Sequence, residues 1–192
     1  MISPTLAEAL RRPLLTQRVL WVGYTASIAV YYVVVQVLSR GAPVAPALPE
    51  ALSPYLWLAA GVVALAAVLY RRRVNSDAYL FALLARPAAP EELAKDGRTG
   101  RVDENYRRQI EAISESDRRF LALFSRLQTQ LIVSLALHES IALLGLVLAF
   151  LHHDPASLVP FGAAAVALNL WVWPSRERLH ERVAPRLLMG PA

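Results

Sequence analysis

The feature that most constrains this chain is a series of long apolar segments. Residues 19–38 form the first segment and residues 52–70 the second, and neither contains a formally charged side chain. At 1.5 Å per residue, about 20 helical residues cross a hydrocarbon core about 30 Å thick. These segments predict an all-α protein that spans a membrane more than once.

Two further segments extend the pattern. Residues 131–151 are an apolar run that contains His138 and Glu139, and residues 158–173 form a shorter run that ends in Trp171 and Trp173. Tryptophan next to a charged flank is typical of a membrane–water interface. The sequence therefore predicts a polytopic membrane protein with four transmembrane helices.

A cleavable signal peptide is the alternative for the first segment. Arg11, Arg12 and Arg18 precede it, and residues 45–47 have an A-x-A pattern that resembles a cleavage site. An apolar region of about 20 residues exceeds the roughly 7 to 15 that are usual in signal peptides. We therefore expect a true transmembrane helix at residues 19–38.

The basic residues predict the orientation. The chain has 20 Lys+Arg and 15 Asp+Glu, a net charge of +5. Three basic residues lie at or before the start of the first span, twelve lie within residues 71–128, four follow residue 173, and only Arg40 lies elsewhere. Lys and Arg beside a span favour the cytoplasmic side. Both termini and the middle segment are predicted to be cytoplasmic, with residues 39–51 and 152–157 facing outward.

These assignments divide the chain into five parts in a cytoplasmic (inner) membrane. They are a cytoplasmic N-terminus at 1–18, a transmembrane hairpin at 19–70, a cytoplasmic helical segment at 71–130, a second transmembrane hairpin at 131–173 and a cytoplasmic tail at 174–192. The 56% hydrophobic content excludes a disordered tail protein, and the absence of cysteine excludes disulfides and thiol chemistry. The middle segment has nearly balanced charge, which argues against a nucleic-acid partner.

The middle segment is predicted to be a helical hairpin. Proline and glycine punctuate it, which predicts a helix at 76–85, a flexible stretch to about residue 101 and a long helix from near Asp103. No proline or glycine separates Asp103 from His138, so this helix and the third span are predicted to be one rod. The rod would project about 40 Å into the cytoplasm.

The long helix carries apolar residues at the a/d spacing of a coiled coil, interrupted by Asp117. They are Tyr106, Ile110, Ile113, Phe120, Phe124, Leu127 and Leu131. This stripe either packs against residues 78–84 within the chain or forms a stalk that binds a second copy or another protein. Arg71, Arg72 and Arg73 at the end of the second span are expected to stop transfer and to attract anionic lipid.

Glu139 is the residue that points to chemistry. It lies about eight residues, or about 12 Å, inside the third span, where an ionised carboxylate costs several kcal/mol on insertion scales. It should therefore be protonated, hydrogen-bonded or turned towards the bundle interior. Polar residues at similar depth are available as partners. They are Thr25, Ser27 and Tyr31 in the first span and Asn169 in the fourth. Glycines at 61, 145 and 162 are expected to allow close helix approach.

Residues 135–151, LALHESIALLGLVLAFL, resemble the ion-carrying second helix of rotary ATP synthase c subunits. In that family a membrane carboxylate is followed by a Gly-Leu-Val-like run, and the helix leaves a cytoplasmic loop and runs outward. The resemblance implies that Glu139 is a reversible proton or cation site. The family's glycine-rich first helix and short polar loop have no counterpart here, so the resemblance implies a similar carboxylate and not a c-ring subunit.

Each of these residues also has a structural interpretation. Glu139 would then bond Ser27 or Asn169 and fix the helix register. His138 is a possible heme or metal ligand, but no second histidine lies at its depth, which favours a hydrogen-bonded histidine. His152, His153 and Asp154 resemble a metal cluster, but adjacent residues before Pro155 are more typical of a polar turn. No metal and no cofactor is predicted.

The sequence thus favours a non-enzymatic membrane protein that acts by association. It would be an accessory or assembly subunit, or a homo-oligomeric scaffold, with the lipid bilayer and a membrane protein or a second copy as partners. The alternative is a component that handles protons or cations through Glu139. An enzyme with a site at the outer loops is a third interpretation, but no pair of nucleophile and base supports it.

Overall fold

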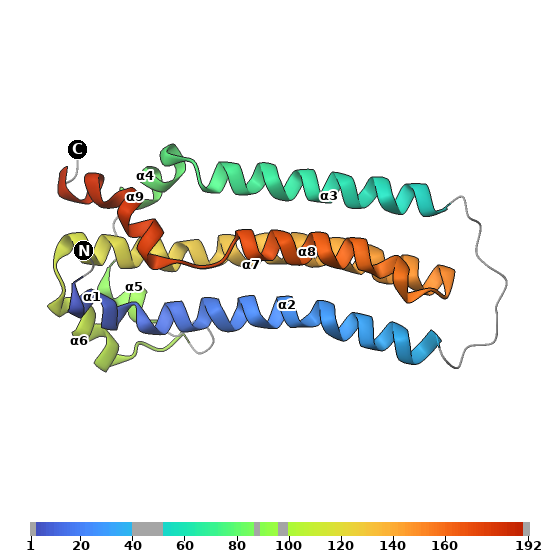
Figure 1. The fold of residues 1–192 in the computed structure, drawn as a ribbon. Helices are drawn as coiled ribbons and strands as arrows, with labels where there is room; N and C mark the ends of the chain where they lie inside the picture. The colour runs from blue at the N-terminus through green and yellow to red at the C-terminus, as the bar shows by residue number, and fades with distance from the viewer. Residues whose placement is uncertain (1–2, 40–51, 87–88, 96–99, 190–192) are drawn as a thin grey trace. The chain divides into compact units, whose positions relative to one another are not determined.

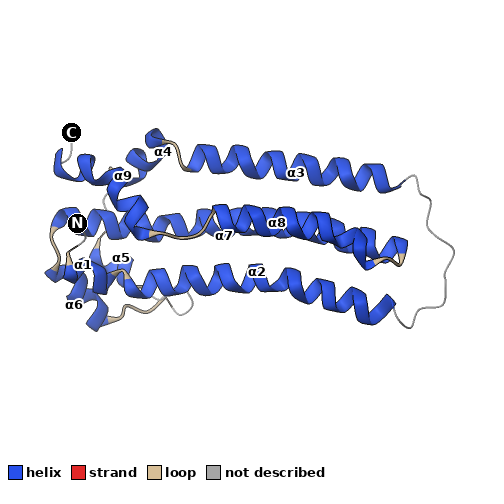
Figure 2. Ribbon diagram, viewed as in Figure 1, coloured by secondary structure: helices blue, strands red, loops and turns tan. Residues whose placement is uncertain are grey.

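The computed structural model describes residues 3–39, 52–86, 89–95 and 100–189, and its regular elements there are helices (Figures 1 and 2). The prediction of an all-α chain is confirmed at this level. The helices are α1 (Pro4–Ala9), α2 (Arg11–Ser39), α3 (Leu52–Val74), α4 (Asp77–Leu84), α5 (Pro90–Ala94), α6 (Glu104–Ala112), α7 (Glu115–His152), η1 (Pro155–Leu158), α8 (Val159–Trp171) and α9 (Arg176–Met189). Most of the predicted outer connection, residues 40–51 with Arg40, lies outside the described residues.

Three helices are long and apolar enough to span a membrane. They are α2, α3 and α7, which carry the first three predicted spans. In the most apolar 18-residue window of α7, 44% of the residues are buried within the chain, against 11% in α2 and in α3. By length and composition, this is a membrane protein with at least three helices of spanning type among its described residues.

The fourth predicted span is not confirmed in the same way. Helix α8 has 13 residues, which cover about 20 Å and fall short of a hydrocarbon core of about 30 Å. Residues Pro155–Trp171 pass the test for a span only together with Arg176–Pro185, and a bend of 48° separates the two pieces. A fourth crossing therefore stays a prediction.

The short helices begin at residues whose side chains accept backbone hydrogen bonds. Ser76 Oγ accepts from Tyr79 N at 3.3 Å and begins α4, close to the predicted start. Asp103 Oδ1 accepts from the N–H groups of Asn105 and Tyr106, each at 3.1 Å, and begins α6. Part of the stretch predicted to be flexible forms α5, and a β-bridge pairs Lys95 with Val102.

The prediction of one rod from Asp103 to the end of the third span is wrong. Helix α6 ends at Ala112, and Ile113 is extended with φ −85° and ψ 157°. Ser114 Oγ then accepts from Asp117 N at 3.1 Å, so a capping serine starts a new helix without help from glycine or proline. From Glu115 onward the chain is one helix to His152, and Asp117, which interrupted the apolar spacing, lies in its first turn.

The chain divides into two compact units. Unit 1 comprises Met1–Arg18, Arg73–Gln130 and Pro174–Ala192, and unit 2 comprises Val19–Arg72 and Leu131–Trp173. The core of unit 1 is one buried cluster that draws on all three of its segments, including Leu6, Phe120 and Val183. The a/d residues from Tyr106 to Leu127 lie in or against this cluster, together with Leu80, Leu83 and Leu84 of α4. Packing within the chain accounts for that apolar spacing.

In unit 2, α7 supplies residues to every buried cluster that also contains a residue of α2 or α3. Ala60 of α3 packs with Ile141 and Phe161, whereas Ile28 of α2 packs with Ala142 and Ala165. Two more clusters join α2 to α7 and to residues at either end of α8. None of the buried clusters of the described residues combines α2 with α3, so these two helices flank the α7–α8 pair.

Gly145 sets the distance between α7 and α8. A Cβ built at this position would lie 2.5 Å from Phe161 Cβ, which is closer than two carbon atoms can approach. At Gly162 a Cβ would lie 3.2 Å from Ile28 Cγ2. Gly61 differs, because a Cβ there would meet nothing within 4 Å, and the expectation of a close approach at Gly61 is wrong.

Candidate functional site

Glu139 accepts two hydrogen bonds from α2. Tyr31 OH donates to Glu139 Oε1 at 2.5 Å, and Ser27 Oγ donates to the same oxygen at 3.0 Å. All three side chains are half-buried. Because a lone carboxylate in an apolar segment is costly, two hydroxyl donors on one oxygen offset much of that cost. Of the four polar residues predicted as available partners, the structure brings Ser27 and Tyr31 to Glu139 and places Asn169 against His138 and Thr25.

Ser27 has a second acceptor within reach. Its Oγ also lies 2.7 Å from the backbone oxygen of Tyr24, one helical turn earlier. A hydroxyl carries one proton, so it donates fully to only one of these two acceptors at a time. When Ser27 donates to the backbone oxygen of Tyr24, its own oxygen can still accept a hydrogen bond. Ser27 Oγ is thus shared between Glu139 and the backbone of its own helix.

His138, the residue before Glu139, pairs with α8 and not with α2. Its Nδ1 lies 2.8 Å from Asn169 Oδ1, and both side chains are 1% exposed. Asn169 Nδ2 donates to Thr25 Oγ1 at 3.2 Å, and the backbone oxygen of Asn169 accepts from Trp21 Nε1 at 2.7 Å. The interpretation of His138 as a hydrogen-bonded histidine is thus the one that the geometry supports.

Helical geometry explains why neighbours in sequence serve different helices. Consecutive residues of an α-helix point about 100° apart, so His138 and Glu139 face two different neighbours of α7. On α2, Tyr24, Ser27 and Tyr31 recur at intervals of three and four and share one face. The position of each polar residue along its own helix thus decides which neighbouring helix its side chain faces.

The residues at the end of α7 form a turn. His153 has φ 52°, its N–H donates to Phe150 O at 3.3 Å, and Asp154 N donates to Ala149 O at 3.1 Å, a Schellman ending. Asp154 Oδ1 then accepts from Ala156 N and begins η1. His152 Nε2 lies 2.7 Å from Ser53 Oγ. Among the described residues, no group of three or more His, Asp or Glu side chains is placed to hold a metal ion.

The three arginines predicted to face lipid lie in the last turn of α3. Arg71 is half-buried, whereas Arg72 and Arg73 are exposed. The backbone oxygen of Arg73 accepts from Ser76 Oγ at 2.7 Å, so the run of arginines leads directly into the cap of α4. This placement fits a segment that ends a membrane span, and none of the hydrogen bonds of Glu139 comes from it.

Sequence reasoning did not predict the roles of Gln17 and Trp21. Gln17 is 3% exposed in unit 1, and its Nε2 donates to Phe124 O at 3.1 Å. Gln17 follows the buried residues Leu10 and Leu14 at helical spacing, so the three lie on one face. A polar residue in line with apolar ones at this spacing is the sequence signal that predicts its burial. Trp21 is the second such residue, because its indole N–H donates to the backbone oxygen of Asn169.

Outside the spans, pKa values are shifted at two helix starts and at one buried phenol of the described residues. Hydrogen bonds from the Tyr106 backbone N–H and from Arg12 hold the pKa of Asp103 below its ordinary value. Burial raises the pKa of the Tyr106 hydroxyl, which donates to Ala9 O at 2.9 Å. The Arg176 guanidinium lowers the pKa of Glu177 near the start of α9.

Comparison with family models, with curated proteins and with solved structures found no match for this chain.

Proposed function

We propose that this chain is a four-span protein of the cytoplasmic membrane, with both termini and residues 71–130 in the cytoplasm. Of its 20 basic residues, 19 fall in those cytoplasmic parts. The packing of unit 1 supports the same topology. Arg182 of α9 pairs with Asp77 of α4 at 2.8 Å, and Arg176 Nη1 lies 3.5 Å from Ala7 O. Segments that pack on one another lie on one side of a bilayer.

This packing also bears on the number of crossings. If residues 1–18, 73–130 and 174–192 share one side, the chain between each pair of segments leaves that side and returns. Helices α2 and α3 would make the two crossings between the first pair of segments. Helix α7 would make the outward crossing between the second pair. The inward crossing would then be made by η1 and α8, which together cover about 28 Å. The proposed fourth span is therefore Pro155–Trp171.

Within that topology, the protein acts by association, as an accessory or assembly subunit or as a homo-oligomeric scaffold, and not as an enzyme. The observation that carries this proposal is the open arrangement of unit 2, in which α2 and α3 flank the α7–α8 pair. Leu58, Val62, Leu65 and Leu69 recur along α3 at steps of four, three and four, and each is more than half exposed. Such a stripe on a spanning helix has the spacing of a helix–helix contact.

The chain contains no cysteine, so single cysteines report contacts without background. Leu65→Cys, at a position 60% exposed, is expected to form a cross-linked dimer or an adduct with a partner protein in native membranes. Ala67→Cys, at a position 2% exposed on the same helix, is the matched control and should stay uncross-linked. A particle of strictly monomeric mass in mild detergent, with no co-purifying protein and no cross-link at position 65, would contradict the proposal.

The second candidate function is proton handling at Glu139, and one observation favours it. Both hydroxyl donors meet on Oε1, and Oε2 of Glu139 carries no hydrogen bond from the described residues. Together with the two acceptors of Ser27, this leaves a carboxyl that can gain or lose a proton without losing all its partners. A proton suits this site better than a metal cation, which prefers more oxygen ligands.

A hydrophobic carbodiimide tests this candidate because it reacts with protonated carboxyl groups in apolar surroundings. Labelling of Glu139 is expected to fall as the pH rises, and Glu139→Gln should abolish it, whereas Glu111→Gln in unit 1 should leave it unchanged. Proton flux into proteoliposomes should be lost in Glu139→Gln and retained in Glu111→Gln. Equal flux in the wild type and in Glu139→Gln would leave Glu139 with only its structural bonds to α2.

A further inference from the structure

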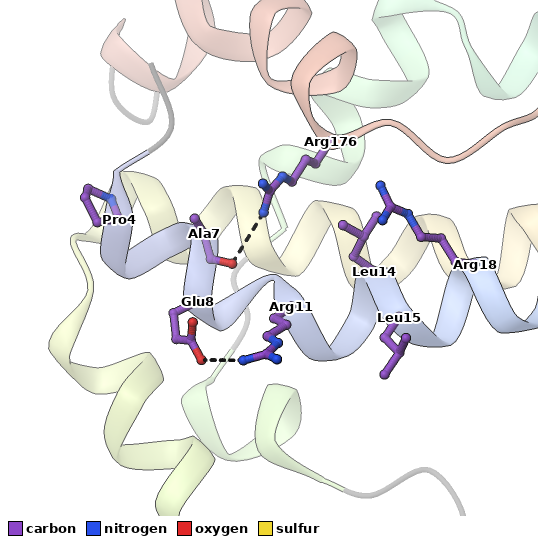
Figure 3. A pocket seen from close by; sticks show the side chains of 8 residues that line it. All are labelled: Pro4, Ala7, Glu8, Arg11, Leu14, Leu15, Arg18 and Arg176. Carbon is purple, nitrogen blue, oxygen red and sulfur yellow. Dashed lines mark hydrogen bonds and ion pairs between the residues drawn. The ribbon is translucent and has the colours of Figure 1, made fainter.

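Unit 1 has an open groove of about 670 Å³ along the beginning of α2 (Figure 3). Its walls come from α1, from the first two turns of α2 and from the start of α9. The lining residues are Pro4, Ala7, Glu8, Arg11, Leu14, Leu15, Arg18 and Arg176. None of these residues belongs to the polar cluster around Glu139 or to the arginines at the end of α3.

The charge of the groove is mainly positive. Three guanidinium groups line it, and Glu8 is the one carboxylate among the lining residues. Arg11 Nη1 lies 3.8 Å from Glu8 Oε1, with the two side chains 80% and 62% exposed, so this pair is a weak surface contact. Arg176 is held more firmly, because its Nε lies 2.7 Å from Glu177 Oε1 and its Nη1 donates to Ala7 O.

Arg12, next to Arg11, is held by contacts with other side chains of unit 1. Its Nη1 donates to Asp103 Oδ2 at 2.9 Å, and its guanidinium lies 5.3 Å from the centre of the Tyr106 ring. Those contacts tie α2 to the start of α6. The neighbouring Arg11 lines the groove, and its 3.8 Å distance to Glu8 is longer than the 2.9 Å hydrogen bond between Arg12 and Asp103.

The groove combines its charges with an apolar surface. Leu14 and Leu15 lie between Arg11 and Arg18 on α2, and Leu15 is 63% exposed. Arg18 is the last charged residue before the uncharged residues 19–38. Given the proposed span, Arg18 lies at the level of the lipid headgroups and Arg11 about 10 Å farther from the hydrocarbon.

We propose that this groove binds the headgroup of an anionic phospholipid. Arg11, Arg18 and Arg176 contact the phosphate, because a guanidinium matches phosphate oxygens in charge and in bidentate geometry. Leu15 contacts the glycerol and the first part of an acyl chain. A free phosphate offers the same oxygens but nothing for Leu15 to contact, which favours the lipid. This inference rests on the proposed membrane placement of residues 19–38.

The test uses the full chain, recovered first from alkali-washed membranes and purified in a non-ionic detergent. Native mass spectrometry then measures binding of phosphatidylglycerol and of zwitterionic phosphatidylcholine. Arg11→Gln is expected to weaken binding of phosphatidylglycerol about fivefold, and Arg11→Gln/Arg176→Gln about 25-fold, the usual effect of basic residues near anionic lipid. Arg108→Gln removes the same charge from an exposed position on α6 and should change binding less than twofold.

Each outcome has a defined meaning. Selective binding of phosphatidylglycerol that is lost in Arg11→Gln but not in Arg108→Gln supports the site. Equal binding of both lipids, or equal losses in both variants, overturns it. If inorganic phosphate displaces the lipid completely at equal concentration, the groove is a phosphate site and the lipid assignment fails. Release of the chain by alkali would instead overturn the membrane placement. Because the Arg11 side chain is 80% exposed, its variant is expected to fold.

Discussion

At the scale of single residues, two neighbours on α7 define how that helix is rotated about its axis. His138 is paired with Asn169 of α8, and Glu139 is paired with Ser27 and Tyr31 of α2. A rotation of α7 by one residue, about 100°, would separate both sets of partners at once. Since unpaired polar groups are costly in apolar surroundings, the two residues together specify one rotation of α7 about its axis.

Asp103 is one residue whose charge links stability to pH. Its carboxylate accepts from two backbone N–H groups and from Arg12, and its pKa is lowered. A group with a depressed folded-state pKa stabilises the folded state above its unfolded pKa, and this contribution is lost as the pH falls through the folded value. Thermal stability should therefore fall below about pH 4.

The measurement is the thermal unfolding midpoint in detergent between about pH 6 and pH 2. Asp103→Asn keeps a capping oxygen but has no titrating carboxyl, so its midpoint should decline less over this range than that of the wild type. Asp154→Asn, which keeps the cap of η1 in unit 2, is the matched control. An identical decline in the wild type and in Asp103→Asn would show that Asp103 does not contribute to the pH dependence.

At the scale of helices, the approach of α7 and α8 depends on one missing side chain. Gly145→Ala places a methyl group 2.5 Å from Phe161 Cβ, and overpacking of this kind costs about 1–3 kcal/mol. The unfolding midpoint of Gly145→Ala should fall, whereas Gly61→Ala, with open space at its Cβ, should be neutral or slightly stabilising. A midpoint for Gly145→Ala equal to that of Gly61→Ala would mean that the two helices separate without cost.

Some helices can be predicted from the sequence, whereas the break between α6 and α7 cannot. Long apolar segments predict α2, α3 and the apolar part of α7, because only burial or lipid accommodates apolar segments of such length. The break at Ser114 is not predictable in this way. Serine is tolerated inside helices as well as at their starts, and what decides here is the packing of Ile113, which is 6% exposed in the core of unit 1.

The candidate site was predictable in its members but not in its pairings. The depth of Glu139, Ser27, Tyr31, His138 and Asn169 along their segments follows from counting residues. Which of them meet depends on the rotation of each helix, and that is fixed by packing between distant parts of the chain. This is why Asn169 pairs with His138 although it was also a plausible partner for Glu139.

At the scale of the whole molecule, unit 1 is discontinuous in sequence. Its core combines Leu6, Phe120 and Val183, which the two apolar hairpins separate along the chain. The proposed topology follows from this and from the basic residues, and it can be tested with single cysteines. Ala112→Cys and Glu181→Cys are expected to resist a membrane-impermeant maleimide in intact cells, and Ala156→Cys is expected to react.

All three positions are exposed within the chain, so differences in labelling report the side of the membrane. Permeabilised cells provide the control, because all three cysteines should then react. Labelling of Glu181→Cys in intact cells would mean an odd number of crossings and would remove the fourth span.

The discontinuity of unit 1 also sets an order in time. Val183 is fully buried, and the ring of His180 lies 5.1 Å from that of Phe120, so residues near the end of this sequence complete a core that Leu6 and Leu10 begin. During synthesis, those first residues emerge long before their partners exist. In the proposed topology, their apolar side chains lack these core partners until the chain through both hairpins has been made. If the proposed topology holds, the core of unit 1 is completed only after unit 2 has been made.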